Sequence, residues 1–174
     1  MMARWIRCSL SKEGLSRDPA GRLEFDSACG GLAAAQTKNA SPILLWGDAD
    51  ASYPFALIAP RRLAPGKAVR WLSWGLAPAV AAYRQFGVPA YLNHDVNDGG
   101  LWLHGRRISA GLVETIGECV VVASSFIKQF PAKCVATPSS MLEQAFRLRL
   151  EAQHGWQFEH SWPSAAEMPA CAVV

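Results

Sequence analysis

The sequence predicts an α+β fold in which a mostly antiparallel sheet is packed with helices. Two observations support this prediction. Short apolar runs, rich in β-branched and aromatic residues, follow one another with brief turns between them. Three other segments place their apolar residues three or four positions apart, as on one face of a helix. The expected order is helix, two strands, helix, four strands, helix.

The strands are predicted from apolar runs that are bounded by turn residues. Val120-Val121-Val122 is typical of a buried strand, and the short connection Thr115-Ile116-Gly117-Glu118 predicts a hairpin between the last two strands. A further short strand is expected at Arg4–Cys8. The main candidates are Pro42–Trp46, Tyr53–Ala59, Val88–Leu92, Leu101–His104, Arg107–Thr115 and Glu118–Phe126.

The first two helices are predicted from apolar spacing and from their end residues. Leu23–Thr37 has near-helical spacing, interrupted by Gly30-Gly31. In the second helix, Pro65 suits the first turn, Pro78 should kink or split the helix, and Gly87 suits its end. Its expected apolar face is Val69, Leu72, Leu76, Val80 and Tyr83.

The last helix has clear signals at both ends. Ser140 and Glu143 have the spacing of a capping box, and Gly155 follows His154 as a stop. Its expected apolar stripe is Met141, Leu142, Ala145, Leu148 and Ala152.

Composition predicts one globular domain over residues 1–174, with loose termini at 1–20 and 162–174. Apolar residues make up 51% of the chain and charged residues 18%. The net charge of +3 comes from scattered basic residues, which argues against a nucleic-acid partner. No run approaches the roughly 20 apolar residues of a membrane span, and the N-terminus lacks the pattern of a signal peptide. Five cysteines without a CxxC pair predict reduced thiols in a cytoplasmic protein.

The stretch from Gly105 to Glu114, Gly-Arg-Arg-Ile-Ser-Ala-Gly-Leu-Val-Glu, resembles the Gly-Arg-Lys-Ile/Leu-Ser/Ala-Gly strand of the biotin/lipoate protein ligase and lipoyl (octanoyl) transferase superfamily. Arg107 stands where the family has the lysine that touches the activated acyl group. The resemblance covers roughly Leu23 to Phe158. It includes Asn97-Asp98 before an apolar strand, and Val120–Phe126, where Ser124-Ser125 replace the family's asparagine.

The resemblance implies a fold, a ligand class and a reaction. Family ligases join a small carboxylic acid, such as biotin, lipoate or octanoate, to ATP and pass the acyl group to a lysine of a carrier domain. ATP and magnesium are therefore the cofactors that the resemblance implies, although no residue here requires them. The family's ligands lie under an Arg-Arg-x-x-Gly-Gly-Gly-x-Val loop. Arg61–Val69 resembles this motif superficially and is interpreted as a loop-to-helix connection. The ligand loop itself is expected between Trp46 and Tyr53, where it is shortened or missing.

The candidate site residues each have a functional and a structural interpretation. Arg107 can supply positive charge but cannot accept a proton, and its alternative is a surface arginine. Asp98, with Asp95 nearby, can orient a ligand, or the segment is a polar turn. Cys134 loosely resembles the transferases' thioester cysteine, or it is an idle thiol. The resemblance places the remaining ligand-contacting candidates at Asn97, Ser109, Gly111, Ser124 and Ser125. No metal ligands are predicted.

Two hypotheses follow. The chain is a divergent relative that binds a small acid or acyl-adenylate and transfers an acyl group to a carrier domain, with Arg107 stabilising the anion. Alternatively, it is a non-catalytic binding or regulatory relative that has lost the Gly-rich loop and the lysine.

Overall fold

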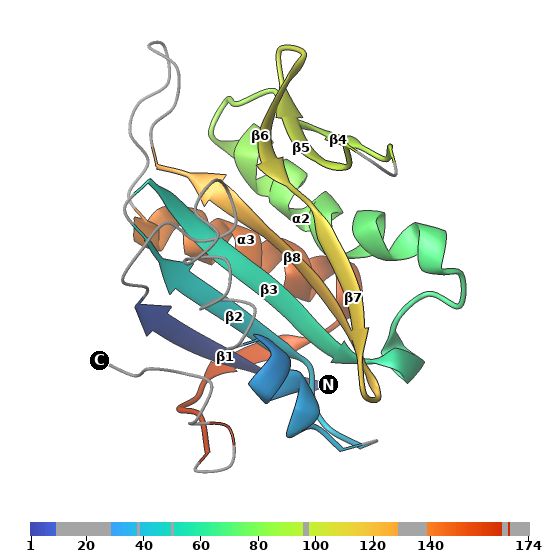
Figure 1. Cartoon of the computed structure of the whole chain (residues 1–174). Helices are drawn as coiled ribbons and strands as arrows, with labels where there is room; N and C mark the ends of the chain where they lie inside the picture. The colour runs from blue at the N-terminus through green and yellow to red at the C-terminus, as the bar shows by residue number, and fades with distance from the viewer. Residues whose placement is uncertain are drawn as a thin grey trace.

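The computed structural model describes residues 1–9, 29–37, 39–49, 51–95, 98–128, 139–164 and 167. Within these residues the strands form two sheets (Figure 1). The large sheet has the order β7-β8-β3-β2-β1-β9 and the small sheet has the order β4-β5-β6. The large sheet contains β1 (Met2–Ser9), β2 (Ile43–Asp48), β3 (Ser52–Pro60), β7 (Leu112–Ile116), β8 (Cys119–Ile127) and β9 (Gln157–His160). The small sheet contains β4 (Tyr91–Asn93), β5 (Gly100–Leu103) and β6 (Arg106–Ala110).

The predicted fold class is confirmed. Neighbouring strands are antiparallel except at β1, which pairs in parallel with both β2 and β9. Helices α2 (Trp71–Gln85) and α3 (Ser139–His154) lie behind the large sheet in Figure 1, and a helical segment at residues 29–34 lies in front of it. The part of the predicted first helix that lies before residue 29 is outside the described residues.

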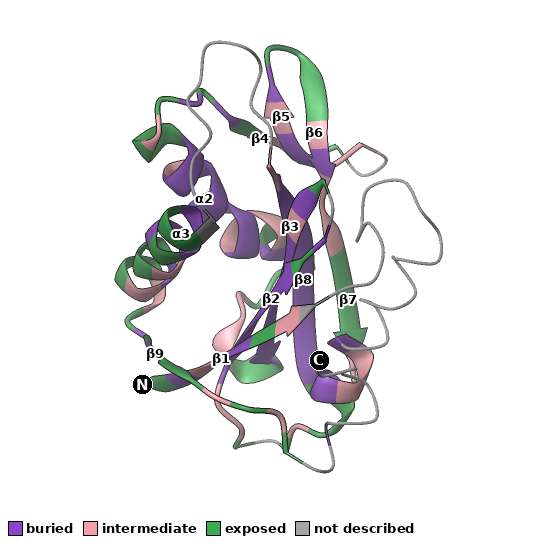
Figure 2. Cartoon of the chain, turned by 90° about the vertical axis from the view of Figure 1, so that its left-hand side faces the viewer, coloured by how far each residue is buried: buried purple, intermediate pink, exposed green. Residues whose placement is uncertain are grey.

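The large sheet is buried on both faces because its strands alternate apolar side chains between two cores. Leu57, Val120 and Val122 face the helices α2 and α3, whereas Ile58, Val121 and Ala123 face the helical segment at 29–34. The buried band runs through the middle of the molecule (Figure 2). Strands buried on both faces have near-continuous apolar sequences, which is why these strands are recognisable in the sequence.

Helix α2 lies very close to β8 because of one glycine. A Cβ atom on Gly75 would lie 2.5 Å from Val122 Cγ1, in the middle of the sheet. Such a contact would force the helix away from the strand. Gly75 therefore fixes the close packing of α2 on the sheet.

The expected strand boundaries agree to within two residues for β1, β2, β3, β5 and β8, whereas β9 was not predicted. The hairpin between β7 and β8 is confirmed, with Gly117 at φ +55° in its turn. However, the strand expected at Arg107–Thr115 is broken at Gly111 into β6 and β7, which belong to different sheets. The strand expected at Val88–Leu92 forms only at Tyr91–Asn93, because the chain first follows the end of α2, where Val88 N–H donates to the carbonyl of Tyr83 at 3.1 Å.

The expected start of the second helix was wrong. Residues 61–63 and 68–70 form two short 3₁₀ turns, and α2 begins at Trp71, whose Nε1 donates to the carbonyl of Pro65 at 2.6 Å. Val69 therefore lies outside the helix and is 81% exposed. Pro78 does not split α2, and Gly87 ends the helix with φ +74°, as expected.

The last helix ends as predicted, at Gly155 with φ +66°, but begins differently. Ser140 lies inside α3, and the Glu143 carboxylate accepts hydrogen bonds from Arg7 on β1 at 2.7 and 3.1 Å, so no capping box forms. Met141 and Leu148 are each 50% exposed. Ala152 is also exposed, and the buried stripe is Leu142, Ala145, Phe146 and Leu150.

Among the described residues, none of the helices has the length and apolar character needed to cross a bilayer.

Candidate functional site at the junction of the two sheets

The candidate site lies where the chain passes from β6 of the small sheet to β7 of the large sheet. Gly111 is the one residue between these strands, and a Cβ atom on it would lie 2.6 Å from Leu72 Cδ1 and 3.2 Å from Gly100 Cα. Glycine thus lets the crossing chain lie against α2 and β5. Pairing between β7 and β8 ends at Leu112 opposite Ala123, so the last residues of β8 have no strand beside them on that side.

Three buried serines occupy this gap. Ser109 Oγ lies 2.9 Å from the Oγ atoms of both Ser124 and Ser125, and it accepts a hydrogen bond from the Ser125 N–H at 2.9 Å. The Ser124 hydroxyl donates to the carbonyl of Ala110 at 2.9 Å. Buried polar groups need such partners, and here side chains replace the missing strand. The structure therefore brings together three residues that the resemblance had placed in the site.

Tyr83 satisfies the next free amide of β8. The Ile127 N–H donates to the Tyr83 hydroxyl oxygen at 2.9 Å. Tyr83 is fully buried, and this burial raises the pKa of its phenol above the usual value. Its hydroxyl therefore stays neutral and closes the open edge of the sheet from the α2 side.

Arg107 and Asp98 form an ion pair beside the small sheet, near the start of β6 and four residues before Gly111. Arg107 Nη1 lies 2.7 Å from Asp98 Oδ1, and the two side chains are 44% and 47% exposed. Trp102 Nε1 donates to the carbonyl of Asp98 at 3.1 Å and thereby holds the turn that carries it. An ion pair this exposed contributes little stability, because water screens both charges. The guanidinium is therefore available to another anion.

The residues before β5 also make a contact that is typical of a polar turn, which was the structural alternative for Asp98. The Asp95 N–H donates to Asn93 Oδ1 at 3.1 Å, which is an Asx-type turn contact. Asn97 and Cys134, the other two predicted site residues, lie outside the described residues.

The connection between β2 and β3 does not fit a nucleotide and magnesium. It spans only residues 49–51, the Ala49 N–H donates to the carbonyl of Ser52 at 3.1 Å, and the Lys128 N–H donates to the carbonyl of Ala51 at 3.1 Å. Asp48 is paired with the Lys128 ammonium. A phosphate cradle needs several free backbone N–H groups in succession, and the Ala49 N–H here already has a backbone partner. In the described part of the chain no three His, Cys, Asp or Glu residues are grouped as metal ligands.

Two residues of this region were not found by sequence reasoning. Tyr83 was expected only as part of an apolar helix face, and Lys128 was not singled out. Lys128 lies 4.7 Å above the Tyr53 ring as well as beside Asp48. Their roles depend on distant parts of the chain meeting in space, so no local pattern identifies them.

Comparison by sequence finds no matching protein-family model and no matching curated protein. Comparison by structure finds close likeness. A T. acidophilum protein with bound lipoic acid aligns with TM-score 0.75 and 8% identity over 98% of this chain and 93% of its own. A lipoate-protein ligase A bound with ATP aligns with TM-score 0.75 and 8% identity over 98% of this chain and 92% of its own. The biotin protein ligase of Leishmania major, in complex with biotinyl-5-AMP, aligns with TM-score 0.54 and 11% identity over 90% of this chain and 76% of its own. The chain therefore has the fold of the biotin/lipoate protein ligase catalytic domain.

Proposed function

We propose that the protein is a non-adenylating relative of the biotin/lipoate ligases that binds a small carboxylic acid at the junction of its two sheets. Arg107 carries the proposal. It places an exposed guanidinium on β6, which leads into the junction and resembles the family's lysine strand. A guanidinium presents two parallel N–H donors that match a carboxylate.

Two features favour binding over ligase chemistry. Arg107 remains charged and cannot exchange a proton as an amine can. The short connection between β2 and β3 does not fit a phosphate cradle, so activation of the acid by ATP is not expected. Without an activated acyl group, transfer to a carrier domain is not expected either, and the small acid is the proposed partner.

Asp98 is the internal competitor of the acid in this proposal. Its carboxylate holds Arg107 at 2.7 Å, so a bound acid has to replace it. Removal of this charge by Asp98→Asn should therefore strengthen acid binding, whereas Arg107→Ala should abolish it. Arg106→Ala is a matched control, since Arg106 is a neighbouring exposed arginine on the same strand.

The test is a thermal-shift titration with biotin, lipoate and octanoate, each with and without ATP and magnesium. A ligand at 100 times its dissociation constant adds about 2.7 kcal/mol of stability, or roughly 5–10 °C for a domain of this size. We expect one of the acids to raise the melting temperature without ATP, and to raise it clearly less in Arg107→Ala than in wild type and Arg106→Ala. A shift that requires both acid and ATP would instead show an adenylating site. Absence of any shift would contradict the proposal altogether.

A further inference from the structure

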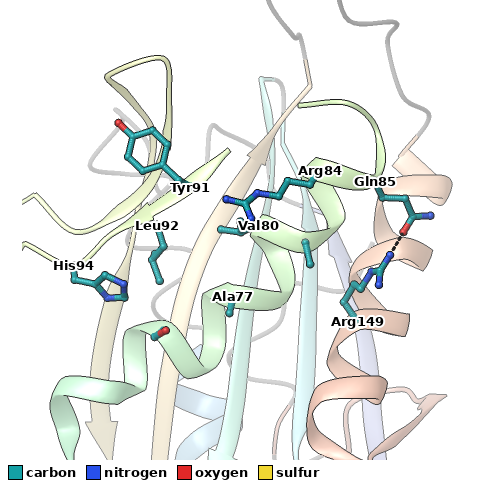
Figure 3. Close-up of a pocket in the computed structure, with 10 residues that line it drawn as sticks. Ala77, Val80, Arg84, Gln85, Tyr91, Leu92, His94 and Arg149 are labelled. Carbon is teal, nitrogen blue, oxygen red and sulfur yellow. Dashed lines mark hydrogen bonds between the residues drawn. The ribbon is translucent and has the colours of Figure 1, made fainter. Parts of the chain in front are cut away.

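A second feature of the molecule, separate from the junction, is an open groove on the outer side of α2. It lies between α2, the start of the small sheet and α3, and its volume is about 690 Å³ (Figure 3). This volume is within the range of small-molecule sites. The groove is lined by Ser73, Ala77, Val80, Ala81, Arg84, Gln85, Tyr91, Leu92, His94 and Arg149.

The lining is positively charged. It contains two arginines and a histidine but no aspartate or glutamate. Elsewhere in the molecule Arg4, Arg7 and Arg107 are all paired with carboxylates. Within the described part of the chain, neither Arg84 nor Arg149 has a carboxylate within ion-pair distance. The groove is therefore a place where two guanidinium charges lack a counter-charge.

Both guanidinium groups are held in place by neutral partners. Arg84 Nε donates to the carbonyl of Ala90 at 3.1 Å, and Arg149 Nη2 donates to Gln85 Oε1 at 3.1 Å. These contacts use one nitrogen of each group and leave the other N–H donors for a ligand. An arginine that is already oriented loses less side-chain entropy when it binds an anion.

Between the charged groups the surface is apolar. Val80 and Leu92 face the groove from α2 and β4, and Ala77 forms part of its floor (Figure 3). Tyr91 forms one wall and is supported by the ring of Trp102, whose centroid lies 6.4 Å from its own. Apolar surface beside fixed cations is complementary to a molecule with an anionic end and an apolar body.

We propose that this groove binds an amphipathic anion, with a carboxylate or phosphate held by Arg84 and Arg149 and a short apolar body lying over Val80 and Leu92. Arg107 does not line the groove, so this site is independent of the acid site proposed at the junction. A carboxylate and a phosphate monoester are both recognised by the paired donors of a guanidinium.

The test uses octyl phosphate and octanoate, with octanol as the neutral probe of the same chain length. Binding to the full-length protein is followed by two-dimensional amide NMR below the micelle concentration of each probe. We expect saturable shifts of α2 and β4 amides with one or both anions and none with octanol. Whichever anion binds more tightly identifies the headgroup. Removal of either arginine should weaken the affinity for the anion about tenfold, as expected when a charge-assisted hydrogen bond is lost.

Variants separate this site from general surface charge. Arg84→Ala and Arg149→Ala should each weaken binding about tenfold, and Arg84→Lys should also weaken it because lysine lacks the planar fork. Arg70→Ala, which removes an exposed arginine outside the groove, should bind as wild type. Since Arg149 is exposed and its guanidinium donates to the exposed Gln85, its variant tests the site even if Arg84→Ala is unstable.

Three results would overturn the proposal. The first is that octanol binds as tightly as the anions. The second is that both Arg84→Ala and Arg149→Ala bind with wild-type affinity. The third is that the shifts of the α2 and β4 amides disappear in Arg107→Ala. The last result would mean that the anion binds only at the junction. Conversely, failure of the junction proposal leaves groove binding in Arg107→Ala intact, so the two failures are distinguishable.

Discussion

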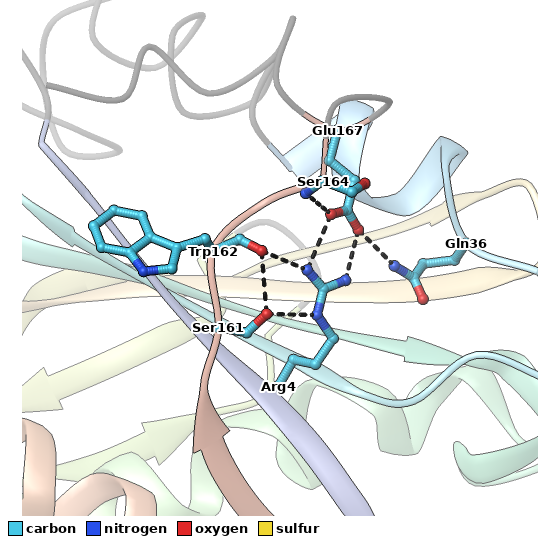
Figure 4. A network of polar contacts seen from close by, with 6 residues as sticks. All are labelled: Arg4, Gln36, Ser161, Trp162, Ser164 and Glu167. Atoms are coloured by element: carbon cyan, nitrogen blue, oxygen red, sulfur yellow. Dashed lines mark hydrogen bonds and ion pairs between the residues drawn. The ribbon is translucent and has the colours of Figure 1, made fainter.

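Glu167 shows how a single residue holds a distant segment of the chain. Its carboxylate accepts two hydrogen bonds from Arg4 on β1, at 2.6 and 3.0 Å, and one from the Ser164 N–H at 2.6 Å (Figure 4). Gln36, next to the helical segment at 29–34, adds a contact at 3.3 Å. The Arg4 hydrogen bond, followed by that of Ser164, lowers the pKa of Glu167 to about 2, although burial opposes it.

This pKa predicts how stability depends on pH. A carboxyl whose folded pKa is depressed stabilises the protein above its unfolded pKa, and this contribution is lost as pH falls toward the folded value. We expect Glu167→Gln to lower the free energy of unfolding by up to about 3 kcal/mol at pH 6. Urea denaturation from pH 6 to pH 2 should show this difference shrinking below about pH 5. Glu159→Gln, on the exposed face of β9, is the control and should show little difference. A difference that is constant with pH would refute the electrostatic explanation.

At the residue scale, the sequence predicts candidate site residues only where they lie in a segment that resembles a family motif. Arg107, Ser109, Ser124 and Ser125 were singled out by resemblance; the structure brings the three serines together at the junction and pairs Arg107 with Asp98 near the start of β6. Their roles in ligand binding stay a prediction. Tyr83 could not be predicted, because its hydroxyl acts on an amide of β8 that is free only where β7 leaves the sheet.

At the scale of the element, α2 explains why a proline does not break a helix. Pro78 has no N–H, so the carbonyl of Trp74, four residues earlier, loses its helical partner. Gln153 on α3 donates from Nε2 to this carbonyl at 3.2 Å. A side chain from a neighbouring helix thus restores the hydrogen bond, and α2 continues from Trp71 to Gln85. The sequence predicted a kink or a split, because Gln153 is far from Pro78 along the chain and no local pattern indicates its contact.

A double-mutant cycle tests this compensation. Gln153→Ala should cost about 1 kcal/mol in wild type, because the Trp74 carbonyl then loses this hydrogen bond. The same change should cost little in Pro78→Ala, where the helix supplies its own N–H. Gln144→Ala, on the exposed side of α3, serves as the control. Equal costs of Gln153→Ala in both backgrounds would show that the two residues are not coupled.

At the scale of the whole molecule, the fold class was predictable, and so was the order of elements apart from β9 and the break between β6 and β7. The division into two sheets was not. The buried strands of the large sheet are continuous apolar runs, so period and composition identify them. The break at Gly111 leaves no such trace, since the residues on both sides of it are equally strand-like. The parallel pairing of β1 with β2 and β9 also depends on contacts between segments far apart in the chain.

The division into two sheets depends on a second glycine, Gly100, at the start of β5. Its φ of +144° is a conformation that favours glycine, and a Cβ atom on it would collide with the backbone carbonyl of Ser109. Because Ser109 also closes the open edge of β8, a shift of β6 would disturb both sheets. We therefore expect Gly100→Ala to lower the free energy of unfolding by at least about 2 kcal/mol, through strain and lost packing. Gly66→Ala, where a Cβ atom meets nothing within 4 Å, should be nearly neutral. Chemical denaturation of both variants measures the difference, and similar stability of the two would mean that the small sheet folds independently of the large one.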